Sequence, residues 1–207
     1  RKMHFFALFY LLLIKLGYNT IMLRMLKNPK TDNIKYFKEC NTRSSTISSR
    51  WPEVTTQRWV SHYGFQATPL PPEIWGQEEL LKAVNEEFKF DNVGVVKLPP
   101  YFNYGWHRDT DRGCSINMLL SHDESHTLFQ TEVVRENMDF RFTELKYKPD
   151  TFYIFNSQES HCVLNFKEPR FLFTCEFSQD KSELSYETLK NWVSKYETRN
   201  QSKELES

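Results

Sequence analysis

The sequence predicts a mainly β protein with flanking helices, whose core is a closed antiparallel barrel or jelly roll. Two observations carry this prediction. Between residues 93 and 177 the apolar residues alternate with a period of two, and about seven short strands follow one another through turn-rich links. Residues with helical spacing lie before and after this stretch, so no helix is expected between the strands.

The segments before residue 93 are predicted to be a linker, a loop and a helix. Residues 27–50 are polar and rich in Ser and Thr, which indicates a linker with one short strand or helix. Residues 66–73 (QATPLPPE) are expected to form a Pro-marked loop. A helix is expected from Pro72 to Phe88. Its apolar residues recur at helical spacing: Leu80, Leu81, Val84 and Phe88.

The predicted strands share short length, alternating apolar residues and turn-forming residues at their ends. They are Val93–Leu98, Cys114–Leu120, Thr127–Val134, Phe140–Tyr147, Thr151–Phe155, His161–Asn165 and Arg170–Phe177. A final helix is expected over about residues 182–197. Its apolar stripe consists of Tyr186, Leu189, Val193 and Tyr196. Residues 31–207 are therefore predicted to form a single domain, with the barrel core at about 93–177.

Composition excludes some classes of function. Lys plus Arg and Asp plus Glu both number 27 in 207 residues, so the formal net charge is zero. Such a charge does not indicate nucleic acid or an anionic membrane as an obligatory partner. The four cysteines show no CxxC spacing, which speaks against a zinc knuckle or a redox motif. Cys114, Cys162 and Cys175 lie in apolar, strand-like runs and are predicted to be buried free thiols in a reducing compartment.

Residues 1–30 are predicted to be a separate apolar N-terminal segment. Its apolar run, residues 5–14 (FFALFYLLLI), has about half the length needed to span a bilayer. Three interpretations stay open: a signal-peptide core without a clear cleavage site, an interfacial anchor, or a segment that is not native, with Met22 or Met25 as the true start. A cytoplasmic location is expected, unless residues 5–14 are a native signal or anchor.

Candidate chemistry begins at the run Trp106-His107-Arg108-Asp109. On an extended chain, residues two apart point the same way, so His107 and Asp109 would present a nitrogen and an oxygen to one point. Alone, such a pair is also common as a surface His beside a loop acid. His161 begins another strand 52 residues after Asp109 and supplies a second imidazole. Two His and one carboxylate are the facial triad that binds non-haem Fe(II) and leaves positions open.

Arg170 begins a largely apolar strand nine residues after His161. If the two strands form a hairpin, the two side chains lie nearly opposite on one face; in a jelly roll they lie on facing sheets. Both arrangements let the guanidinium reach the metal cavity. An Arg that begins an apolar strand usually has a carboxylate partner, and its planar fork suits the distal carboxylate of a dicarboxylic acid.

These four residues resemble the signature of the Fe(II)/2-oxoglutarate-dependent oxygenases: HxD, a distal His, and an Arg nine residues further. The similarity covers about residues 93–177 and includes the runs YFNYGWHRDTDRGCSINMLL and NSQESHCVLNFKEPRFLFTCEF, which resemble the metal-binding strands of small bacterial and phage members. The resemblance implies a double-stranded β-helix, a cupin-like jelly roll. It also implies Fe(II) held by the catalytic His107, Asp109 and His161, 2-oxoglutarate held by Arg170, O2 as co-substrate, and ascorbate as a candidate auxiliary reductant.

The sequence departs from the family pattern at two places. Leu172 stands where a Ser commonly follows the Arg, so part of the carboxylate pocket must come from elsewhere; Tyr101, Tyr104 and Asn117 are the candidates. Glu176 stands where the nucleic-acid-demethylating branch has a second Arg, which disfavours that branch. In the loop after HxD, a weak ion pair between Asp111 and Arg112 is expected.

The resemblance implies a prolyl or aspartyl/asparaginyl hydroxylase-like dioxygenase that hydroxylates a C–H bond, with succinate and CO2 as co-products. The expected partner is a peptidyl or small-molecule substrate. A peptidyl substrate is slightly favoured, because short links between the strands would leave the end of the barrel open. Nucleic acid is not expected, and membrane contact only if the N-terminal segment is native. Two alternatives stay open: a cupin-like metal protein with non-oxidative chemistry, and a non-catalytic binding module on the same fold.

Overall fold

The computed structural model describes residues 33–56, 59–62, 64–121, 125–134 and 139–206. The predicted N-terminal segment, residues 1–30, lies outside the described residues, and the three interpretations of it stay predictions. Among the described residues, no helix combines the length and the apolar character that crossing a membrane requires.

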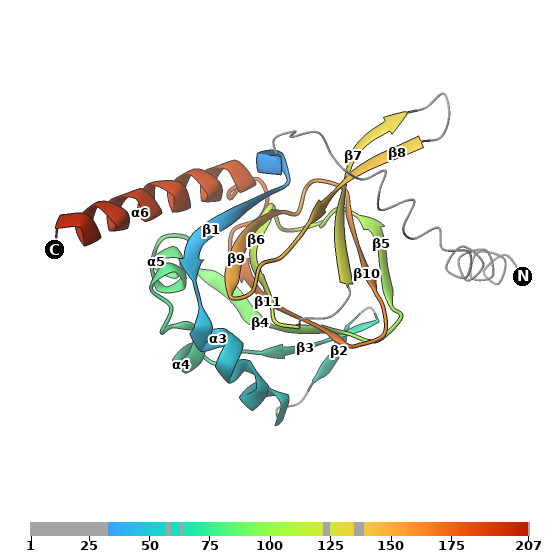
Figure 1. Ribbon diagram of the computed structural model, residues 1–207, viewed down its shortest axis with the longest axis horizontal. Coiled ribbons are helices and arrows are strands. Elements are labelled where there is room, and N and C mark those ends of the chain that lie inside the picture. The colour runs from blue at the N-terminus through green and yellow to red at the C-terminus, as the bar shows by residue number, and fades with distance from the viewer. Residues whose placement is uncertain (1–32, 57–58, 63, 122–124, 135–138, 207) are drawn as a thin grey trace, which may run out of the picture.

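Two antiparallel sheets face each other and form the barrel (Figure 1). The large sheet has the strand order β1-β9-β6-β11-β4-β3-β2. Its strands are β1 (Phe37–Arg43), β9 (Thr151–Asn156), β6 (Cys114–Leu119), β11 (Arg170–Phe177), β4 (Phe90–Leu98), β3 (Phe65–Pro69) and β2 (Val60–His62). The small sheet has the order β5-β10-β7-β8. Its strands are β5 (Asn103–His107), β10 (His161–Asn165), β7 (Ser125–Val134) and β8 (Asp139–Leu145).

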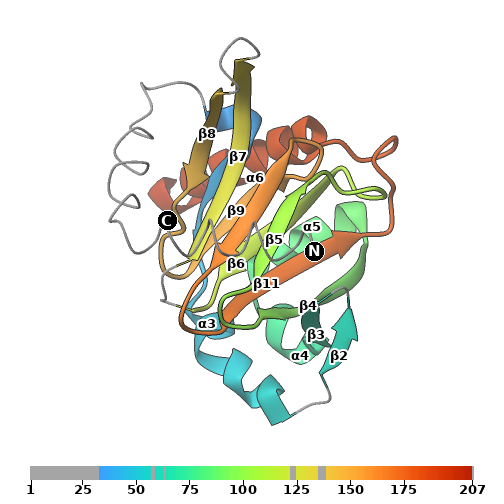
Figure 2. The same cartoon turned by 90° about the vertical axis from the view of Figure 1, so that its right-hand side faces the viewer.

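Helices flank the large sheet. They are α3 (Ser45–Arg50), α4 (Pro72–Trp75), α5 (Glu79–Phe88) and α6 (Tyr186–Glu206), with short 3-10 turns at Asn33–Lys35 and Trp51–Thr56. Apolar residues of α5 and α6 pack with the strands of the large sheet into one core, and Figure 2 shows both helices behind that sheet. The predicted fold class, mainly β with flanking helices around a jelly-roll barrel, is confirmed.

Period-two alternation explains how the large sheet separates its two faces. In β11, Phe173, Cys175 and Phe177 join the core under the helices. The alternate residues of the same strand line the cavity inside the barrel: Arg170, Leu172, Thr174 and Glu176. The sheet therefore buries its apolar face under the helices and turns polar and charged side chains toward the inside of the barrel.

Three expectations about the region before residue 93 are wrong. The predicted linker contains both a strand and a helix, β1 and α3, and β1 forms the edge of the large sheet. The polar character of β1 is explained by α6, because the carboxylate of Glu197 accepts hydrogen bonds from Lys38 Nζ (2.7 Å) and from the backbone N–H of Asn41 (2.6 Å).

The predicted loop at residues 66–73 contains most of β3. The single predicted helix is two helices, α4 and α5, separated by Gly76–Glu78.

All four cysteines are buried and free, as the apolar runs predict for three of them. Burial raises the pKa of the Cys40, Cys114 and Cys162 thiols to about 12, and it raises the pKa of Cys175 as well. A raised pKa favours the neutral thiol, so the reactive thiolate is about a thousandfold scarcer at pH 8 than in an ordinary cysteine.

We therefore expect no rapid reaction of the native protein with a disulfide reagent at pH 8, and four reactive thiols after unfolding in guanidinium. The rate on the native protein should rise as the pH is raised. A thiol that reacts in the native protein at the unfolded rate would contradict this burial.

Candidate metal centre

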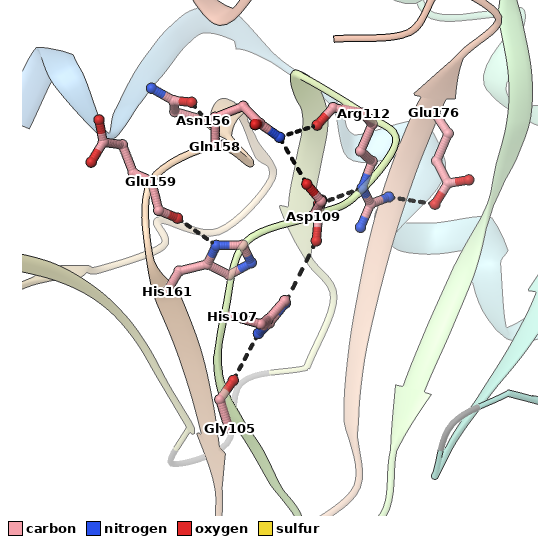
Figure 3. A network of polar contacts seen from close by, with 9 residues as sticks. All are labelled: Gly105, His107, Asp109, Arg112, Asn156, Gln158, Glu159, His161 and Glu176. Carbon is pink, nitrogen blue, oxygen red and sulfur yellow. Dashed lines mark hydrogen bonds and ion pairs between the residues drawn. The ribbon is translucent and has the colours of Figure 1, made fainter.

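Three side chains converge at one end of the barrel: His107 at the end of β5, Asp109 in the following loop, and His161 at the start of β10 (Figure 3). Each offers a ligand atom, and these atoms all lie within 4.8 Å of one another. His107 Nε2 is 3.6 Å from Asp109 Oδ1, and the two imidazole ring centroids are 4.1 Å apart. The predicted HxD pair and distal His are therefore brought together.

A β-bulge directs His107 into the barrel. His161 pairs with His107 and Val163 pairs with Tyr104, so two steps along β10 match three steps along β5. The extra residue lets Tyr104 and His107 both line the cavity although they are three residues apart. β5 ends at His107, so Asp109 lies beyond the strand ladder. Asp109 is placed instead by its amide, which donates to Ser157 O at 3.0 Å.

Both imidazoles are oriented through their Nδ1 atoms. His107 Nδ1 lies 2.7 Å from Gly105 O, and His161 Nδ1 lies 2.9 Å from Glu159 O. A carbonyl can only accept, so each Nδ1 carries the proton and each Nε2 keeps its lone pair for a metal. Burial lowers the pKa of His161 to about 4, so this imidazole is neutral at physiological pH.

The second oxygen of Asp109 is held by Arg112. Arg112 Nε lies 2.6 Å from Asp109 Oδ2, and Nη1 contacts Glu176 Oε1. Burial opposes the charge of Arg112, but the carboxylates of Asp109 and Glu176 raise its pKa overall. The expected ion pair between Asp111 and Arg112 is wrong: the guanidinium pairs with Asp109 and Glu176, and Asp111 is exposed.

Arg170 is 1% exposed and lies on β11, in the sheet that faces His161. His161 and Arg170 therefore lie on facing sheets, as in a jelly roll, and not opposite each other in a hairpin. Arg170 Nη2 donates to Thr127 Oγ1 at 2.9 Å, and the guanidinium carbon lies 5.8 Å from the centre of the Tyr147 ring. Burial lowers the pKa of Arg170, an effect that Tyr147 opposes. No carboxylate of the described residues pairs with this buried cation.

No protein-family profile matches the sequence, and no curated protein matches it. Solved structures do match the fold. An oxidoreductase of the 2OG-Fe(II) oxygenase family from Burkholderia pseudomallei has a TM-score of 0.53 and 10% identity, over 70% of this chain and 85% of that one. A prolyl-4-hydroxylase from Pseudomonas putida has a TM-score of 0.51 and 15% identity, over 72% and 95%. The present chain has the 2OG-Fe(II) oxygenase fold.

A third similar structure is HygX from Streptomyces hygroscopicus, solved with nickel, 2-oxoglutarate and hygromycin B bound. It has a TM-score of 0.50 and 10% identity, over 69% of this chain and 82% of that one. At these identities the likeness establishes the fold. The roles of individual residues rest on the geometry of this chain.

The donor atoms of this chain fit both groups that the 2OG-Fe(II) oxygenase fold implies. Two imidazole nitrogens and one carboxylate oxygen are a set that suits Fe(II). At the Arg170 end, three buried polar atoms form no hydrogen bond within the described part of the chain: Asn117 Oδ1, Tyr147 Oη and Arg170 Nε. Buried polar atoms are normally paired, so this set points to a missing ligand, and a carboxylate would accept from Arg170 and Tyr147.

The predicted co-substrate residues divide into two groups. Asn117 is buried and lines the cavity, as expected for a polar residue in the middle of an apolar strand. Tyr104 lines it beside His107, with ring centroids 4.3 Å apart. Tyr101 is 72% exposed and does not line the cavity. Its φ is +58°, and its backbone N–H donates a hydrogen bond to Phe166 O, so the side chain points outward.

Sequence reasoning missed Thr127 and Tyr147, which lie closest to the Arg170 guanidinium. Thr127 pairs with Val163 across the small sheet, and period-two alternation places it on the inner face. That signal was available in the sequence. Tyr147 was predicted as the last residue of a strand, but β8 ends at Leu145, and the flanking Lys146 and Lys148 gave no sign that this side chain would line the cavity.

Proposed function

We propose that this protein is an Fe(II)- and 2-oxoglutarate-dependent dioxygenase that hydroxylates a C–H bond of a protein side chain or a small metabolite, releasing succinate and CO2. The observation that carries the proposal is a pairing within one barrel. Three metal-ligand atoms converge at one end, and a buried guanidinium without a carboxylate partner stands on the facing sheet.

Bound Fe(II) would supply the activation of O2 and the oxidative decarboxylation of 2-oxoglutarate. The side chains of the protein would position the metal and the co-substrate. His107, Asp109 and His161 hold the metal from one side, and the bonds to Gly105 and Glu159 keep both imidazoles in the ligand tautomer. Because His161 has a lowered pKa, it does not need to lose a proton when the metal binds near neutral pH.

Arg170 would bind the distal carboxylate of 2-oxoglutarate. Its guanidinium is fixed by Thr127 and by the Tyr147 ring, so little side-chain freedom remains to be lost on binding. Burial excludes water and strengthens the ion pair that a carboxylate would form there. The cavity spans the distance between this cation and the metal ligands, so one bound 2-oxoglutarate would contact both.

The same cavity leaves room for a substrate. Its volume is about 850 Å³, within the range of pockets that hold drug-sized ligands. The part away from Arg170 extends over β4, β3 and β2 and is lined by apolar side chains, among them Val60, Phe65, Ala67 and Val96. This lining supports an organic substrate with an apolar portion, and we propose a peptidyl or amino-acid substrate within that class.

The deciding experiment is an anaerobic titration of the Fe(II)-loaded protein with 2-oxoglutarate. We expect a visible metal-to-ligand charge-transfer band that saturates with 2-oxoglutarate and is absent in His161→Ala. His126→Ala, on β7 and paired with Glu144, is the matched control and should keep the band. Bound iron without a band would overturn the proposal and favour a cupin-like protein with non-oxidative chemistry.

A further inference from the structure

Arg112 joins the proposed metal ligand Asp109 to the opposite wall of the barrel (Figure 3). Its Nε contacts Asp109 Oδ2 at 2.6 Å and its Nη1 contacts Glu176 Oε1, on β11. The Asp109 side chain is 13% exposed and the Arg112 side chain 34%, so the contact with Asp109 is largely shielded from water. Such a pair is shorter and stronger than an exposed surface ion pair.

The backbone under this pair is also fixed. Gln158 Nε2 donates to Asp109 O at 2.9 Å and to Arg112 O at 2.8 Å, so one side chain ties both residues to the turn before β10. The Asp109 amide donates to Ser157 O in the same turn. Asp109 and Arg112 are therefore held through their main chains as well as through their side chains.

The two oxygens of Asp109 consequently have different surroundings. Oδ1 faces the imidazole of His107, with 3.6 Å to Nε2, the atom that carries the free lone pair. Oδ2 is turned to Arg112. Carboxylates bind metals through one oxygen or through two, and a freely rotating aspartate can change between these modes.

We propose that Arg112 is a positioning residue that keeps Asp109 as a one-oxygen ligand, with Glu176 holding Arg112 in place. The inference rests on the proposed function. A 2-oxo acid needs two coordination positions and O2 needs a third, so a second oxygen from Asp109 would compete for a required position. By binding Oδ2, the guanidinium leaves the open face of the metal free.

The test uses Co(II), whose visible absorption reports its coordination number without turnover. Arg112→Ala should bind Co(II) about 10–100-fold more weakly than the wild type, a smaller loss than removal of a ligand, because all three ligands remain. Its d–d spectrum should change, and calorimetry should show at least about tenfold weaker binding of 2-oxoglutarate to the Co(II) protein. Arg112→Lys should recover part of the loss, because one ammonium can still pair with Asp109.

Arg108→Ala is the matched control, since it removes the same charge from an exposed neighbour that does not line the cavity. It should leave the Co(II) spectrum and the 2-oxoglutarate affinity unchanged. Glu176→Ala frees Arg112 without removing it and should shift both readouts in the direction of Arg112→Ala, so the proposal stays testable if Arg112→Ala does not fold.

Wild-type spectrum and wild-type 2-oxoglutarate affinity in both Arg112→Ala and Glu176→Ala would overturn the inference. Equal changes of the Co(II) spectrum and the 2-oxoglutarate affinity in Arg108→Ala and Arg112→Ala would also overturn it. Such a result would show that only the positive charge of Arg112 matters and not its contact with Asp109. Failure of the proposed function looks different: the wild-type Co(II) protein would then not bind 2-oxoglutarate at all.

Discussion

Replacing Arg170 by Met should raise the stability of the metal-free protein while removing its affinity for 2-oxoglutarate. The guanidinium is buried, it donates to Thr127 but pairs with no carboxylate of the described residues, and burial lowers its pKa, so the apo fold carries an incompletely compensated cation. Exchanging such a charge for an apolar side chain of similar length stabilises proteins by about 1–4 kcal/mol. In a chain of this size each kcal/mol raises the melting temperature by about 2–4 °C.

The loss of ligand affinity follows from the same residue. Truncating one partner of a buried charge pair costs about 2–5 kcal/mol, which corresponds to a roughly thirtyfold to several thousandfold rise in the dissociation constant. Calorimetry on the metal-loaded protein measures this change, and thermal unfolding of the apo protein measures the stability. Arg50→Met, which removes a surface guanidinium paired with Glu53, is the control and should change neither quantity much.

The expected result is a higher stability of the apo protein together with a lower affinity for 2-oxoglutarate, and each half can fail separately. A lower apo stability in Arg170→Met would show that the guanidinium is already satisfied by Thr127 and Tyr147 and has a structural role. An unchanged affinity for 2-oxoglutarate would remove the co-substrate assignment and would leave the metal site untouched.

Replacing Asp109 or His161 by Ala should abolish specific metal binding. Each change removes one of three ligands, and since the loss of a supporting hydrogen bond alone costs about 10–100-fold in metal affinity, the loss of a ligand should cost more than about a hundredfold. Asp109→Ala also leaves Arg112 beside two imidazoles with only Glu176 to balance it. Competition with a coloured chelator measures the affinity.

The matched control for this pair is again His126→Ala, because His126 pairs with Glu144 in the small sheet and is not part of the three-residue group. It should bind metal as the wild type does. Retention of wild-type metal affinity in both Asp109→Ala and His161→Ala would place the metal elsewhere and would remove the basis of the proposed function.

Sequence reasoning was most successful where a local pattern decides the structure. Strands such as His161–Asn165 and Arg170–Phe177 were predicted with the bounds that the structure has, because alternation and bounding turn residues are both local. The same alternation separates the helix-facing and cavity-facing sides of β11. The convergence of His107, Asp109 and His161 was predicted from spacing, although Asp109 lies beyond the end of β5.

The features that were missed depend on tertiary contacts. β1 is polar because its side chains and amides pair with Glu197 on α6, some 150 residues away in sequence, and no local pattern shows this. Tyr147 is half-buried between two exposed lysines because its ring packs against Tyr153, a contact that no local pattern shows. The Arg112 contact with Asp109 depends on Glu176, which the sequence showed only as a departure from a family pattern.

The bulge in β5 means that the candidate metal site tolerates change in both the identity and the number of the residues between Tyr104 and His107. A Cβ added at Gly105 would meet no described atom within 4 Å, so other side chains fit at this position. Removing one residue between Tyr104 and His107 would leave these two residues two apart, which restores a regular ladder with β10 and keeps both side chains on the inner face. Variation among related chains would therefore be tolerated here as substitution or as loss of the bulged residue, and either change would leave the ligand residue in place.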